Sequence, residues 1–217
     1  MKQIITKSLQ DIFSKDVILF VLKIGFISFV VTLFLTWNLW GTLTGFISAY
    51  LSWIPWEWLQ TSGASVATFS VAYMLFIIIV ALLTSLYSEK LLIALAKKRY
   101  PDVPVVGSAD IITSILLTLK ASAVFLLLFI ITLPLLFIPI FGQVVILYLW
   151  SVLLKEPTIY DVGALFIDDK TTLKEKRKQT RLLAMIAALF NYIPLINIFA
   201  PVFAQILFLH HILKEEQ

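Results

Sequence analysis

The sequence predicts an all-α integral membrane protein, and three observations support this prediction. Hydrophobic residues make up 60% of the 217 residues and charged residues 14%, whereas soluble domains average about 45–50% apolar and about 25% charged residues. Two runs, residues 121–154 and 182–213, contain no Asp, Glu, Lys or Arg. Prolines interrupt both runs. We therefore expect one membrane domain over residues 1–217, with two full transmembrane helices, two proline-broken, partly penetrating helical hairpins and amphipathic cytoplasmic helices.

The first half of the chain supplies an interfacial helix and both full spans. Residues 1–16 carry an apolar helical stripe beside Lys2, Lys7 and Asp11, which predicts a helix lying at the membrane surface. Residues 17–37 and 65–87 are apolar, with Lys23 the one charged residue of the two segments. About 20 helical residues cross a hydrocarbon core about 30 Å thick, so each segment is long enough to span.

The two charge-free runs are expected to fold back as hairpins. Residues 121–154 would measure about 51 Å as one helix, which is too long for a single crossing. Proline removes a backbone N–H and clashes with the preceding turn, so a helix kinks or ends there. The prolines near the middle of the runs are Pro134, Pro139, Pro194 and Pro201. The second run, residues 182–213, has legs of about 12 residues, too short to cross, and is predicted to be re-entrant.

Basic residues indicate the orientation. Residues 38–63, between the two spans, contain no Lys or Arg, whereas residues 1–16, 88–110 and 155–181 are rich in them. Cytoplasmic segments carry an excess of Lys and Arg. The pattern predicts cytoplasmic N- and C-termini, and it makes residues 155–181 a basic cytoplasmic segment.

The polar residues of the apolar segments include few of the types that catalyse reactions. No Asp or Glu lies within them, which argues against a carboxylate proton relay and against cation coordination by acidic rings. Cysteine is absent, so thiolate metal sites are excluded. We expect no enzymatic activity, no metal and no cofactor. The basic stretch has no interleaved aromatics, so no nucleic-acid partner is expected either.

The remaining polar groups suit an inorganic anion. Amide side chains and helix N-termini donate hydrogen bonds without bringing negative charge, and lysine adds positive charge. Half-helices that begin after Pro139 and Pro201 would direct their N-termini at the middle of the protein. The predicted anion path consists of Lys15, Lys23, Gln143, Asn191, Asn197 and Gln205.

Each of these residues also has a structural interpretation. Lys23 can extend its amine to the cytoplasmic interface. Asn191 and Asn197 can cap or turn a helix break, and the two glutamines can bond between helices. The adjacent His210 and His211 are expected at the interface, in the last turn of the chain.

Several motifs resemble one membrane protein family. Residues 137–143 read Phe-Ile-Pro-Ile-Phe-Gly-Gln, residues 149–150 read Leu-Trp, and residues 191–201 read Asn-Tyr-Ile-Pro-Leu-Ile-Asn-Ile-Phe-Ala-Pro. In these motifs the chain resembles the CysZ-type sulfate permease family, which includes the eukaryotic etoposide-induced membrane proteins. The resemblance implies an oligomeric inner-membrane protein with two long spanning helices and two partly penetrating hairpins. It also implies sulfate movement into the cytoplasm for cysteine synthesis.

The chain departs from that family at the start of the first span. Sulfate-type members carry a Gly-Leu-Arg motif there, where this chain has Lys15-Asp16-Val17-Ile18. Lysine supplies charge but lacks the planar fork with which arginine binds an oxyanion. The alternative hypothesis is therefore a membrane scaffold that transports nothing and holds a partner through residues 155–181.

Overall fold

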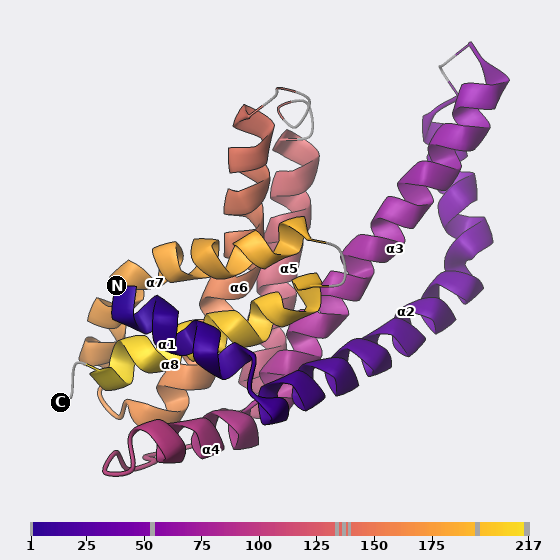
Figure 1. Cartoon of the computed structure of the whole chain (residues 1–217). Helices are drawn as coiled ribbons and strands as arrows, with labels where there is room; N and C mark the ends of the chain where they lie inside the picture. The colour runs from indigo at the N-terminus through magenta and orange to yellow at the C-terminus, as the bar shows by residue number, and fades with distance from the viewer. Residues whose placement is uncertain are drawn as a thin grey trace.

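The computed structural model describes residues 2–52, 55–132, 135, 138, 140–193 and 196–214, and it places their side chains except at positions 59, 170–172, 174–179 and 214. Pro134, Pro139 and Pro194 lie outside the described residues. The described part of the chain is all helix and loop, which confirms the all-α prediction (Figure 1). The elements are α1 (Lys2–Ile12), α2 (Lys15–Tyr50), α3 (Glu57–Tyr87), α4 (Glu89–Arg99), α5 (Ile111–Thr132), α6 (Phe141–Phe166), α7 (Lys170–Ala188), η2 (Leu189–Tyr192), η3 (Ile196–Phe199) and α8 (Ala200–Lys214).

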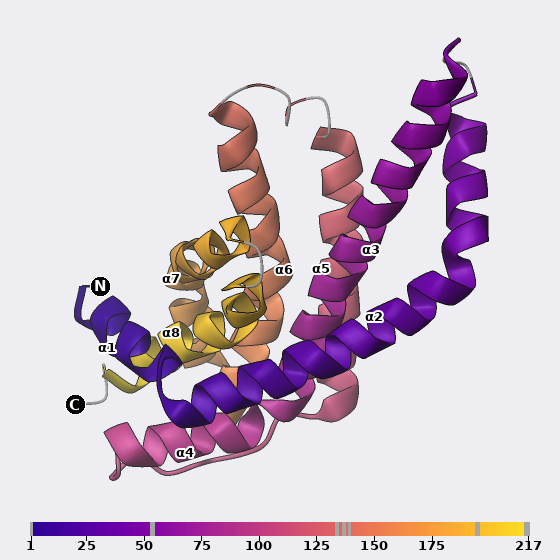
Figure 2. The ribbon, with the colours of Figure 1, turned by 45° about the vertical axis from the view of Figure 1, so that its right-hand side comes forward.

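Helices α2 and α3 form a long antiparallel pair. The 36 residues of α2 extend about 54 Å and the 31 residues of α3 about 46 Å, so both exceed the predicted segments 17–37 and 65–87. Figure 2 shows that α2 bends partway along and that the far ends of α2 and α3 stand away from the other helices. The pair therefore leaves a large apolar surface for lipid or another protein chain.

Four described helical segments are long and apolar enough to cross a membrane: Lys15–Tyr50, Gln60–Tyr87, Ile111–Thr132 and Ile196–Leu213. The first three carry many exposed apolar side chains, as lipid-facing helices do. The fourth, which contains α8, is mostly enclosed by the rest of the chain. How deeply each hairpin enters a bilayer stays a prediction.

Both charge-free runs fold back on themselves. Helix α5 packs against α6, and α7 packs against α8. Asp110 caps the start of α5, because its Oδ2 accepts a 2.8 Å hydrogen bond from the Thr113 backbone N–H. The second reversal is built from the short 3₁₀ helices η2 and η3, so α8 begins only at Ala200. The helix break at η2 and η3 is what positions the candidate site.

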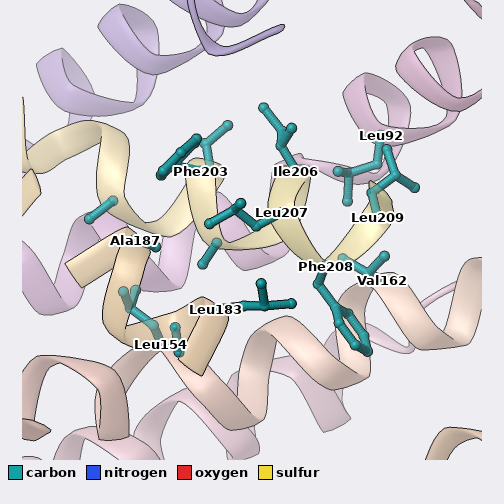
Figure 3. Packing of buried hydrophobic residues seen from close by; sticks show 14 of the residues in the cluster. Leu92, Leu154, Val162, Leu183, Ala187, Phe203, Ile206, Leu207, Phe208 and Leu209 are labelled. Atoms are coloured by element: carbon teal, nitrogen blue, oxygen red, sulfur yellow. The ribbon is translucent and has the colours of Figure 1, made fainter. Parts of the chain in front are cut away.

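Helix α8 is the centre of the core. Its residues from Ala200 to Leu213 are buried. Figure 3 shows Phe203, Leu207 and Phe208 of α8 packed among side chains of α4, α6 and α7. A helix whose apolar residues lie on all its sides is stable when other helices surround it. Helix α1 lies along α8, so the N-terminal helix covers the C-terminal one (Figure 1).

Replacing Gly107 by alanine is expected to destabilise the protein by about 1–3 kcal/mol. A Cβ at this position would lie 2.7 Å from the backbone oxygen of Ala164 on α6, and backbone cannot move aside as a side chain end can. The neighbouring Val106 N–H bonds to Leu165 O at 2.9 Å, which fixes the loop against α6. Thermal unfolding of the detergent-purified protein measures the effect.

The matched control is Gly45→Ala. A Cβ there meets nothing within 4 Å, and alanine is the better helix former by about 0.5–1 kcal/mol. We expect the control to unfold at the wild-type temperature or above it. Equal destabilisation by both substitutions would contradict the packing explanation.

Candidate functional site

The structure separates the six predicted path residues into two groups. Asn197 and Gln205 are buried, with 1% and 2% of their surface exposed. Asn191 is half-buried, and the exposed members are Lys15, Lys23 and Gln143. The two buried amides have different partners, Tyr73 for Asn197 and Asp161 for Gln205. Within a single chain the six residues therefore do not line one common path.

A wide groove lies between α2 and α3 and ends at the helix break. Its volume is about 1370 Å³, and most of its wall is apolar, including Phe26, Trp37, Trp40 and Phe69. At one end the wall is formed by η3, with Asn197 at its edge. Gly25 of α2 permits this approach, because a Cβ there would lie 3.2 Å from Ile198 Cδ1.

Asn197 is the polar group best placed to hold a ligand in this groove. Its Nδ2 donates a hydrogen bond to the Tyr73 hydroxyl, and its Oδ1 has no partner among the described residues. The amide can turn over by 180°, so that Tyr73 donates to Oδ1 and both Nδ2 hydrogens become available. The N-terminal end of α8 lies beside it and adds partial positive charge. Together these groups can donate hydrogen bonds to an anion.

The break is also tied to the first hairpin. The Tyr192 hydroxyl donates to the backbone oxygen of Gln143, near the start of α6. Asn191 keeps a buried Oδ1 without a described partner. The start of α6 is therefore linked in space to η2.

A second polar cluster surrounds Asp161, which has 3% of its surface exposed. Ser85 Oγ donates to its Oδ2 at 2.6 Å, Ser114 Oγ to its Oδ1 at 3.0 Å, and Gln205 Nε2 to its Oδ2 at 3.1 Å. The four residues come from α3, α5, α6 and α8. Sequence reasoning missed this cluster, because Asp161 lies outside the apolar runs, in a segment expected to be solvated.

Burial raises the pKa of the Asp161 carboxyl to about 6, and the hydrogen bonds from Ser85, Ser114 and Gln205 offset only part of this effect. Asp161 lies outside the four candidate membrane-crossing helices. All three of its hydrogen-bond partners are neutral. At neutral pH the protein therefore holds a buried negative charge that these partners do not compensate.

The raised pKa of Asp161 predicts that the folded protein loses stability as the pH rises from about 4 to about 6. The folded state binds this proton more tightly than the unfolded state, whose reference pKa is 3.8, so the loss reaches about 3 kcal/mol above both values. Thermal unfolding in choline-based buffers between pH 4 and pH 7 measures it. The stability of the Asp161→Asn variant is expected not to change with pH in this range. If its stability falls with pH as in the wild type, Asp161 is not the group responsible.

A third cluster joins α1, α4 and α8. Arg99 Nε donates to Asp11 Oδ1 at 3.0 Å, His210 Nε2 lies 2.9 Å from Asp11 Oδ2, and the Tyr100 hydroxyl lies 2.8 Å from His210 Nδ1. Burial raises the pKa of Asp11, but the hydrogen bonds from His210 and Arg99 outweigh it and lower this pKa overall. These contacts fix the N-terminal helix to the C-terminal one.

This cluster corrects two expectations. His210 and His211 were expected at the interface, and both are buried, because α8 is enclosed by α1, α4, α6 and α7. Asp11 was expected on the polar face of a surface helix and is buried against α8. Among the described residues, no three His, Asp or Glu side chains lie close enough together to hold a metal ion.

Comparison with known proteins identifies a family. The family described as Sulfate transporter CysZ/Etoposide-induced protein 2.4 matches residues 4–201 of the chain. No curated protein and no solved structure matches the chain significantly. The match extends from the third residue of α1 to the second residue of α8.

Proposed function

The chain belongs to the Sulfate transporter CysZ/Etoposide-induced protein 2.4 family and is a multi-pass membrane protein, and from this premise we propose that it is an anion permease of the inner membrane. Its favoured substrate is sulfate, which enters the cytoplasm for sulfur assimilation. The proposal involves no catalytic step and no cofactor. The N- and C-termini face the cytoplasm.

The observation that carries the proposal is the broken helix at Asn197. An oxyanion accepts hydrogen bonds and brings none, so it needs donors that are already desolvated and fixed. Asn197 can present its amide hydrogens to the groove once Tyr73 donates to its carbonyl. The N-terminal end of α8 adds a favourable dipole at the same place.

The single chain provides only part of a path, because the groove is largely apolar and open. We propose that a homo-oligomer closes it. Lys15 and Lys23 are exposed on α2, and Leu22, next to Lys23, lines the groove. In an oligomer these lysines would attract anions toward the groove. Lipid covers the remaining apolar surface of α2, α3 and α5.

Uptake of radiolabelled sulfate into proteoliposomes tests the proposal. We expect uptake above that of protein-free vesicles, inhibited by unlabelled sulfate and much less by chloride. Absence of flux in vesicles of either protein orientation removes the permease assignment. If a stable partner then co-purifies through residues 155–181, the scaffold alternative is supported instead.

Cysteine labelling tests the topology. The chain has no native cysteine, so the single substitutions Gln3→Cys, Ser52→Cys and Asp168→Cys each give one labelling site. We expect positions 3 and 168 to react from the cytoplasmic side and position 52 from the outside. Labelling of positions 3 and 168 from opposite sides would contradict hairpins that return to the face they entered.

A further inference from the structure

A small cavity beside Asp161 is separate from the groove. It lies between α3, α6 and α8, and its volume of about 10 Å³ is close to what one water molecule needs. Asp161, Ser85 and Gln205 line it, as do Thr84 and Thr158. Its polar wall is therefore made of carboxylate, hydroxyl and amide groups.

Two buried oxygen atoms at this cavity have no hydrogen-bond donor among the described residues. They are Gln205 Oε1 and Thr84 Oγ1, on side chains that are 2% and 1% exposed. The Gln205 Nε2 atom is already directed at Asp161. A buried acceptor without a donor is unfavourable, so both atoms favour an occupant of the cavity, either a water molecule or a cation.

A proline adds a third oxygen. Pro157 lies inside α6 and has no N–H to donate to the carbonyl of Leu153, four residues earlier. Pro157 and Leu153 both line the cavity. In membrane transporters, backbone carbonyls freed where a helix unwinds coordinate small cations, and the Leu153 carbonyl lacks its helical donor because of Pro157.

We propose that this cavity binds a monovalent metal cation, with Na⁺ as the favoured ion. Hard cations take oxygen ligands, and the wall supplies one carboxylate together with hydroxyl, amide and backbone oxygens. One carboxylate balances a single positive charge, which disfavours a divalent ion. A proton on Asp161 would leave Gln205 Oε1 and Thr84 Oγ1 without a partner, whereas a metal ion in the cavity would take oxygen ligands from residues that line it.

The site has a consequence for transport, and this part rests on the proposed function. Gln205 and Asn197 are eight residues apart on η3 and α8, or about 12 Å along the helix. A cation held by Gln205 would fix α8 between α3 and α6, and with it the end that carries Asn197. Na⁺ in the cavity would therefore hold the proposed anion-binding residue in place.

Thermal unfolding of the purified full-length protein tests the site without any anion substrate. Unfolding is measured at pH 8 in NaCl, KCl and choline chloride of equal ionic strength. We expect a saturable increase of about 2–4 °C in NaCl over choline chloride. Asp161→Asn is expected to abolish the increase, and Asp168→Asn, which changes an exposed carboxylate, to retain it.

Asp161→Asn changes the charge of the site, so a second variant tests the site without changing its charge. Thr84→Val removes a hydroxyl that has no described partner, so the variant should fold, and we expect its midpoint for Na⁺ to rise at least about tenfold. The site is overturned if the unfolding temperature is the same in all three salts. It is also overturned if Na⁺ does not alter the dependence of the unfolding temperature on pH. Na⁺ stabilisation without sulfate uptake refutes only the permease, and sulfate uptake without Na⁺ stabilisation refutes only the cation site.

Discussion

Replacing Asp11 by alanine is expected to lower the free energy of unfolding by about 2–4 kcal/mol, because it removes the acceptor of the buried His210 and of Arg99, whose side chain is 32% exposed. The Asp11 carboxylate is buried between Arg99 and His210. Its removal leaves the Arg99 guanidinium and the fully buried His210 imidazole without their acceptor. Helix α1 covers α8, which lies at the centre of the core. The substitution should therefore weaken the packing of α8 as well as that of α1.

Thermal unfolding in detergent measures this effect, and Asp102→Ala is the matched control. Asp102 is exposed in the turn that follows Tyr100, close to the cluster in sequence, and its substitution should change stability by less than about 0.5 kcal/mol. Tyr100→Phe removes only the hydroxyl beside His210 Nδ1 and should cost about 1 kcal/mol. If Asp11→Ala and Asp102→Ala unfold alike, the cluster does not hold α1 in place.

The lowered pKa of Asp11 gives the cluster its own pH dependence. A carboxyl whose folded pKa is depressed contributes stability above its unfolded pKa, here 3.8, and loses that contribution as the pH falls through the folded value. The Asp11 contribution is therefore lost on acidification below about pH 4. The Asp161 contribution has the opposite sign and changes between about pH 4 and pH 6, so the two are separable.

The helical hairpins could be predicted from the sequence because a charge-free run interrupted by proline is a local property. Helix ends were harder to predict. The predicted first span ends at Trp37, but α2 continues to Tyr50. Polar residues after position 37 mark the edge of the apolar segment and do not stop a helix. Asn38 and Thr44 bond to backbone oxygens four residues earlier within the same helix.

The buried charges could not be predicted in the same way. Asp11, Asp161 and His210 lie at the margins of apolar segments, where a charged side chain ordinarily reaches water. They are buried because α8 passes between α1, α4 and α6, a packing that depends on contacts far apart in sequence. Asp161 and Gln205 are 44 residues apart, and Asp11 and His210 are 199 apart. The hydroxyl and amide side chains that bond to Asp161 also cannot be told apart, in the sequence, from ordinary polar residues of a helix.

Replacing Asn197 by aspartate is expected to reduce sulfate uptake about 100-fold while preserving the fold. Aspartate has nearly the shape of asparagine and can accept a hydrogen bond from the Tyr73 hydroxyl, so η3 and α8 should keep their positions. It replaces a hydrogen-bond donor by a negative charge in a mostly apolar groove. Like charges brought together away from water cost several kcal/mol, and about 1.4 kcal/mol corresponds to a factor of ten.

Initial rates of sulfate uptake into proteoliposomes of equal protein content measure this prediction, with Asn38→Asp as the control. Asn38 undergoes the same chemical change on an exposed face of α2, so its uptake should stay within about twofold of wild type. The unfolding temperature of Asn197→Asp should fall by a few degrees, because a carboxylate replaces an amide that is 1% exposed, and the variant is assayed below that temperature. Wild-type uptake by a folded Asn197→Asp protein would mean that sulfate does not pass near the broken helix, because a fixed carboxylate there repels any dianion within reach of the amide.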